Sequence, residues 1–200
     1  MSVRPTIGVV LAGGASRRMG GSPKALKTFG SGTLVTHAVE RLRKQVDHVI
    51  LNGPVELGEH VPDSVPIVPD PFAERRGPLA GVLAGLAWCE REVPDATTVI
   101  SVPVDTPFFP FDLAARLTEA RPPEGNALAR AGGRTHPAFG AWNVSLREAL
   151  QSFLATSDTN KVLAFTERHA CGFADFADAS AFENANTPEE LARVRERLDE

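Results

Sequence analysis

The stretch TIGVVLAGGASRRMGGSPK, residues 6–24, decides the fold of this 200-residue chain. It opens with Thr6–Leu11, a short apolar run rich in β-forming residues, and Gly13-Gly14 end that run. This pattern predicts a buried strand that passes directly into a glycine-rich loop. Paired glycines let backbone N–H groups approach phosphate oxygens with no side chain in the way, so the loop is a candidate phosphate site.

Strands and helices alternate along the rest of the first half. The predicted strands are residues 48–51, 65–68 and 97–102, and the predicted helices are residues 33–43, 79–91 and 111–119. Such alternation favours a Rossmann-like α/β fold, with a mostly parallel sheet and helices on both faces.

The second half is less regular. Residues 127–131 and 134–142 predict a hairpin around Gly132-Gly133, and residues 144–153 predict a helix. Thr187-Pro188-Glu189-Glu190 is typical of a helix start, so a final helix is predicted from there to about residue 198. No repeat or linker interrupts the pattern, which indicates a single domain over residues 1–200.

Bulk properties exclude several classes of protein. The net charge of −4 argues against a nucleic-acid binder. Two cysteines, Cys89 and Cys171, do not make a disulfide framework, which favours a reducing compartment. No secretory signal and no membrane-spanning apolar stretch is recognised, so a cytoplasmic protein with no membrane partner is expected.

Charge is unevenly distributed, because no acidic residue precedes Glu40. Five cations lie in that region: Arg4, Arg17, Arg18, Lys24 and Lys27. Four of the five lie in or beside the glycine-rich loop, which favours a site for a polyanion over a merely solvated basic face. Arg18 and Lys24 supply the charge that a triphosphate requires. The alternative is an ordinary strand-to-helix turn with incidental cations.

Ligands of open α/β sheets bind beyond the carboxyl ends of the strands, so the residues after each strand are candidates. Asn52 and Asp70 follow two predicted strands, although from the residues alone each reads as a turn former. Asp105 follows the strand at 97–102. It is placed to hold Mg²⁺, which proteins usually bind through one or two carboxylates plus substrate phosphates. Its alternative role is to cap the turn that follows.

Together these motifs resemble the signature of nucleotidyltransferases of the sugar-nucleotide type, Leu-x-Gly-Gly-x-x-x-Arg-Met-Gly followed by a lysine. Within that group the chain is similar to the molybdenum cofactor guanylyltransferases. Four more segments carry the resemblance over nearly the whole chain: RGPLAG at 76–81, PVDTPF at 103–108, HPAFG at 136–140 and NANTPEEL at 184–191. Two positions depart from the family pattern, since Pro23 stands where aspartate is common and Val104 where cysteine is common.

The resemblance implies transfer of GMP from GTP to the terminal phosphate of the molybdopterin form of molybdenum cofactor, with Mg²⁺ bound by Asp105 and pyrophosphate released. The catalytic residues are then Arg18, Lys24 and Asp105. The nucleotide-binding residues are Leu11, Ala12, Gly13, Gly14, Lys24, Asn52, Asp70 and Asp105. Further contacts with nucleotide or acceptor are implied for Gly77, Pro78, Leu79, Gly81, Asn184 and Asn186. Transient contacts with other cofactor-biosynthesis proteins or with molybdoenzymes follow from the same resemblance.

Three alternatives stay open at this point. The chain could be a cytidylyltransferase for the same pterin, or an enzyme acting on a sugar phosphate, because no residue separates guanine from cytosine. It could also be a nucleotide-binding adaptor without turnover, against which Arg18, Lys24 and Asp105 weigh. His136 is expected to be structural, and Cys89 is expected to lie in the core rather than to act as a nucleophile.

Overall fold

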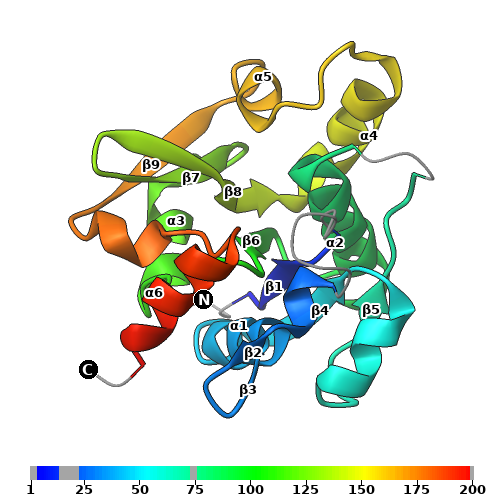
Figure 1. The fold of residues 1–200 in the computed structure, drawn as a ribbon. Helices are drawn as coiled ribbons and strands as arrows, with labels where there is room; N and C mark the ends of the chain where they lie inside the picture. Colours follow the sequence, from blue (N-terminus) through cyan, green and yellow to red (C-terminus); the bar gives the residue numbers. More distant parts are fainter. Residues whose placement is uncertain (1–3, 14–22, 73–75, 199–200) are drawn as a thin grey trace.

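The computed structural model of the protein describes residues 4–13, 23–72 and 76–198. A seven-stranded sheet crosses it in the order β5-β4-β1-β6-β8-β7-β9 (Figure 1). Its strands are β1 Thr6–Leu11, β4 His48–Asn52, β5 Ile67–Val68, β6 Thr98–Pro103, β7 Asn126–Ala131, β8 Arg134–Asn143 and β9 Cys171–Phe176. The strands β5, β4, β1 and β6 are parallel, β8 is antiparallel to β6 and β7, and β9 runs parallel to β7. A separate ribbon pairs β2 Thr28–Phe29 with β3 Gly32–Thr33.

Helices cover both faces of the sheet, as the alternation of elements predicts (Figure 1). The α-helices are α1 Leu34–Arg43, α2 Pro78–Glu92, α3 Leu113–Ala120, α4 Arg147–Thr156, α5 Val162–Thr166 and α6 Pro188–Glu196. Short 3₁₀ turns are η1 Lys24–Leu26, η2 Val55–His60, η3 Val144–Leu146 and η4 Ala179–Phe182. None of the helices in the described ranges is both long and apolar enough to cross a membrane.

Two apolar layers hold these helices to the sheet, because successive strand residues face opposite sides. On one face of the sheet, Val10 belongs to an apolar cluster with buried residues of α1, α3 and α6. On the other face, Ile7 and Val9 belong to a second apolar cluster with buried residues of α2, α4 and α5. Gly8 brings α1 close to the sheet, since a Cβ there would lie 2.6 Å from Leu42 Cδ2. Cys89 is fully buried on α2, where burial raises the pKa of its thiol to about 11, so its predicted core position is confirmed.

The predicted elements of the first half are present with small shifts of their ends. The strand predicted at 65–68 is only two residues long, and the helix predicted at 111–119 begins at Leu113. The second half contains two elements that the sequence did not predict, α5 and β9. The hairpin β7–β8 and the strand β9 therefore extend the same sheet instead of forming a separate layer.

Candidate active site at the carboxyl edge of the sheet

The parallel strands end level with one another. Leu11 at the end of β1 pairs with Asn52 of β4 and with Pro103 of β6, and Asn52 pairs in turn with Val68 of β5. The residues that follow these strands consequently meet at one edge of the sheet.

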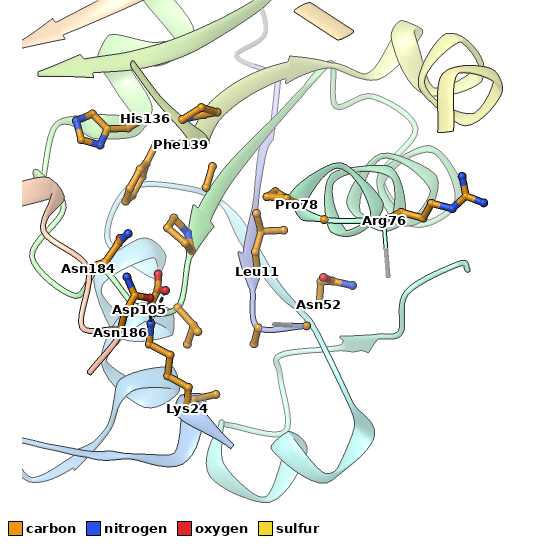
Figure 2. Close-up of a pocket in the computed structure, with 18 of the residues that line it drawn as sticks. Leu11, Lys24, Asn52, Arg76, Pro78, Asp105, His136, Phe139, Asn184 and Asn186 are labelled. Atoms are coloured by element: carbon orange, nitrogen blue, oxygen red, sulfur yellow. Dashed lines mark hydrogen bonds and ion pairs between the residues drawn. The ribbon is translucent and has the colours of Figure 1, made fainter. Parts of the chain in front are cut away.

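A cavity of about 660 Å³ lies at this edge. It is lined by Leu11, Ala12, Gly13, Lys24, Ala25, Asn52, Asp70, Arg76, Gly77, Pro78, Pro103, Val104, Asp105, Arg134, Thr135, His136, Pro137, Ala138, Phe139, Asn184 and Asn186. Figure 2 shows many of these side chains gathered around one space between β1, β6, β8 and the start of α2.

One wall of the cavity is built by the loops after β1, β4 and β5. Asn52 is 2% exposed, and its side-chain amide donates hydrogen bonds to Val68 O at 3.1 Å and to Asp70 Oδ1 at 2.9 Å. A Cβ on Gly13 would lie 3.1 Å from Asp70 Oδ2, so the glycine lets the backbone after β1 pass close to this pair. The turn-forming pair Asn52 and Asp70 is thus a single hydrogen-bonded unit that faces the cavity.

The start of α2 forms the adjoining rim. Gly77 has φ +66°, a left-handed conformation that favours glycine, and Pro78 is the first helical residue. Both line the cavity, as predicted, but Leu79 and Gly81 do not. Leu79 is fully buried in the core. Gly81 packs against Asn52 instead, because a Cβ there would lie 2.2 Å from Asn52 Oδ1.

In the lining of the cavity one ammonium group is held between two side-chain oxygens. Lys24 Nζ lies 2.6 Å from Asp105 Oδ2 and 2.6 Å from Asn186 Oδ1 (Figure 2). The Lys24 side chain is 16% exposed and that of Asp105 is 23% exposed, so the ion pair is partly shielded from water. A carboxylate and an amide oxygen already surround a cation here, and these are ligand types that suit a hard divalent cation.

Asn184 and Asn186 are fixed beside Asp105 by local hydrogen bonds. Ala185 N donates to Asp105 O at 2.8 Å, and Thr106 Oγ1 donates to Asn184 Oδ1 at 2.6 Å. The carboxylate of Glu190, in the capping box that begins α6, accepts from Asn186 N at 2.7 Å. The C-terminal segment is therefore part of the cavity, and it brings to the lining the two asparagines for which the resemblance implies contacts with nucleotide or acceptor.

The far wall is a bulge in β8. Leu128 of β7 pairs with Gly140 and Ala129 pairs with His136, so residues 137–139 have no partner in β7. A proline lacks the N–H that a sheet ladder needs, so Pro137 fits such a bulge. Ser101 Oγ fixes the bulge, because it donates to Ala138 O at 2.8 Å and accepts from Trp142 Nε1 at 2.9 Å. This wall is not predicted by the sequence pattern, although the proline within a predicted strand is a signal for it.

His136, for which the sequence predicts a structural role, lines the cavity. Its ring stacks on Phe182 with centroids 4.6 Å apart, and burial lowers the pKa of its imidazole. In Figure 2 the ring is turned away from Leu11 and Asn52. Two other predicted site residues, Gly14 and Arg18, lie outside the described residues.

The family of the chain follows from its sequence as well as from this geometry. A family model described as a MobA-like NTP transferase domain matches residues 8–171. The chain belongs to the MobA-like NTP transferase family. It is accordingly a nucleotidyltransferase.

Relatives support membership of the MobA-like family over nearly the full length. A molybdenum cofactor guanylyltransferase of Cereibacter sphaeroides is 44% identical over 192 residues, covering 96% of each chain. One from Bradyrhizobium sp. is 42% identical over 195 residues, covering 96% of this chain and 92% of the relative.

Solved structures of low identity share the fold. A molybdopterin-guanine dinucleotide biosynthesis protein A of Archaeoglobus fulgidus superposes with a TM-score of 0.75 at 18% identity, covering 97% of this chain and 98% of that one. A manganese complex of a Mycobacterium tuberculosis protein superposes with a TM-score of 0.73 at 19% identity, covering 98% of this chain and 100% of that one.

Proposed function

We propose that this protein transfers GMP from GTP to the terminal phosphate of the molybdopterin form of molybdenum cofactor, giving the guanine dinucleotide cofactor and pyrophosphate. The observation that carries the proposal is the meeting of Lys24, Asp105 and Asn186 at one point of the cavity. It occurs in a chain that is 44% identical to a named molybdenum cofactor guanylyltransferase.

The donor nucleotide is assigned to the part of the cavity nearest β1 and β4. Backbone N–H groups around Gly13 and the ammonium of Lys24 face the triphosphate, because both line the cavity at the carboxyl end of β1. The Asn52–Asp70 pair and Pro78 bind the nucleoside end. Arg18, from the same loop, is proposed as a further phosphate contact.

Mg²⁺ is proposed as the divalent cation, with the carboxylate of Asp105 as its protein ligand. Lys24 Nζ, which contacts Asp105 Oδ2 and Asn186 Oδ1 in this structure, would turn toward the phosphates when the ion binds. The described residues include no group of three His, Cys, Asp or Glu side chains that could form a complete metal cage. A single carboxylate suffices for Mg²⁺ because substrate phosphates and water supply its other ligands. When bound, the ion supplies charge neutralisation on the phosphates.

In the proposed transfer an oxygen of the acceptor phosphate attacks the α-phosphorus of GTP. The bond between that phosphorus and the oxygen bridging to the β-phosphate breaks, and pyrophosphate leaves. A phosphate monoester has a second pKa of about 6, so it is already an anion near neutral pH and needs no strong general base. The residues therefore act by positioning: Lys24 keeps positive charge at Nζ beside the phosphates, and Asp105 keeps its oxygens at the point of transfer.

The experiment is an assay of the purified protein with GTP, Mg²⁺ and molybdopterin, with pyrophosphate and the dinucleotide product measured separately. The proposal predicts that the two products appear in equal amounts. GTP binding without either product would identify a nucleotide-binding adaptor. Pyrophosphate release with a sugar phosphate in place of molybdopterin would identify a sugar-phosphate nucleotidyltransferase.

A further inference from the structure

Three lysine and arginine side chains of the described chain line the cavity, and they differ in what they contact. Lys24 is bound to Asp105 and Asn186. Arg76 donates from Nη1 to Leu154 O at 2.6 Å and lies 5.4 Å from the ring centre of Phe72. In Figure 2 it points away from Lys24. The charges of these two are thus already engaged by protein groups.

Arg134 differs from both. Its side chain is exposed, it lines the cavity, and it makes no hydrogen bond or ion pair with another residue in the described ranges. Its charge is felt locally, because it contributes to lowering the pKa of His136. A guanidinium that borders a cavity without a carboxylate partner is well suited to bind an anion from outside.

The position of Arg134 in the sheet indicates which of the two substrates supplies the anion that it binds. Asn52 ends β4 and Arg134 begins β8, while Asp105 follows β6, which lies between them in the sheet order. Neighbouring strands are about 4.8 Å apart, so β4 and β8 are separated by roughly 14 Å across the sheet. The nucleoside wall and Arg134 therefore lie on opposite sides of the proposed point of transfer.

The wall that carries Arg134 is rigidly supported. Gly132 and Gly133, with φ +57° and +74°, form the tight turn that begins β8. His136 stacks on Phe182, and Ser101 binds the carbonyl of Ala138. Such support places a binding side chain at a defined position relative to the reacting atoms.

We propose that Arg134 binds the phosphate of the acceptor and holds it on the β8 side of Asp105, opposite the donor nucleotide. This inference rests on the proposed function, because it assigns the two substrates of that reaction to the two walls of one cavity. A planar guanidinium donates hydrogen bonds to two phosphate oxygens at once, which orients the acceptor as well as attracting it.

The test compares Arg134→Gln with the parent in two equilibrium titrations. One follows molybdopterin binding by its fluorescence, and the other follows binding of GTP with Mg²⁺. Loss of one charge-assisted contact is expected to weaken molybdopterin binding about tenfold or more while GTP binding stays within twofold. Arg134→Lys should recover only part of the loss, because an ammonium keeps the charge but not the bidentate geometry.

Arg130→Gln is the matched control. Arg130 lies in the same hairpin and is exposed, but it pairs with Asp175 and does not line the cavity. Unchanged molybdopterin affinity in Arg134→Gln, or an equal loss in the control, would overturn the inference. A loss of GTP affinity as large as that for molybdopterin would place Arg134 on the donor side and overturn it too. Both titrations need no turnover, so a parent that binds molybdopterin without transferring GMP contradicts the proposed function alone.

Discussion

At the scale of single residues, the ion pair between Lys24 and Asp105 joins the end of the proposed phosphate-binding loop to the proposed metal position. The two residues are 81 positions apart in sequence, yet Nζ and Oδ2 are 2.6 Å apart. Each was predicted as a site residue from its own motif. Their direct contact could not be predicted, because it depends on β1 and β6 ending at the same edge of the sheet.

Asp105→Asn should remove most turnover while leaving the fold intact. Asparagine keeps the shape and turn-forming capacity, and the backbone carbonyl still accepts from Ala185, but the carboxylate charge is lost. Removing a preorganised electrostatic group from an active site costs about 10²-fold or more in turnover. The measurement is steady-state GMP transfer together with a thermal melt. Asp112→Asn is the control, since Asp112 is exposed and does not line the cavity. Normal turnover in Asp105→Asn would refute the metal role.

Lys24→Met should weaken GTP binding, because one positive charge beside the triphosphate is lost. The loss of a charge-assisted hydrogen bond predicts a rise of about tenfold or more in the dissociation constant of GTP. Lys27→Met removes the same charge three residues along, at a side chain that does not line the cavity, and should leave the constant unchanged. Isothermal titration of both variants checks this. Equal GTP affinity in the two variants would show that the loop assignment is wrong.

At the scale of elements, the helix α2 packs through its glycines against the cavity wall that holds Asn52, the wall proposed to bind the nucleoside. A Cβ on Gly81 would lie 2.2 Å from Asn52 Oδ1 and 2.6 Å from Leu11 Cδ2, whereas one on Gly85 would lie 3.3 Å from Val9 Cβ. The two positions, one helical turn apart, therefore have different roles. Gly81 leaves room for a site residue, and Gly85 allows α2 to pack on the sheet.

Gly81→Ala should impair GTP binding more than Gly85→Ala does. In the first variant the new methyl group displaces Asn52, which is hydrogen-bonded to Asp70 on the cavity wall. In the second it meets only core side chains, so an effect on stability is expected with little effect on GTP affinity. Both exchanges also gain roughly 1 kcal/mol of helix propensity, which makes them a matched pair. These roles of the two glycines would be contradicted if Gly81→Ala bound GTP as tightly as the parent while Gly85→Ala bound it more weakly.

The elements of the first half were predictable because each has a clear apolar period and clear ends. The elements of the far wall were not. The bulge at residues 137–139 depends on Ser101 and Trp142, which are distant in sequence, and β9 carries the exposed residues Phe173 and Asp175 on one side. The local spacing of apolar residues predicts neither a contact between side chains that are distant in sequence nor the pairing of an edge strand.

At the scale of the whole molecule, the crevice rule for parallel sheets placed most of the candidate site correctly in one cavity. Leu11, Asn52, Asp70 and Asp105 line it because every parallel strand ends at the same level. The wall proposed to bind the acceptor comes from the second half of the chain, which adds three strands to that same sheet. The proposed donor side on β1 and β4 and the proposed acceptor side on β8 thus lie apart because of the order of strands.

The proposed function depends on which nucleoside triphosphate the protein prefers, and this preference is expected from the resemblance over the whole chain. Pro23 departs from the family pattern beside Lys24. The relatives that are 44% and 42% identical over most of the chain are named guanylyltransferases, so we expect guanine to be preferred.

The most direct measurement is a competition assay with limiting molybdopterin, Mg²⁺ and equal concentrations of GTP, CTP, ATP and UTP, in which the dinucleotide products are separated by mass. We expect the guanine dinucleotide to be the dominant product and pyrophosphate to match it in amount. A cytosine dinucleotide formed in equal or greater amount would contradict this expectation.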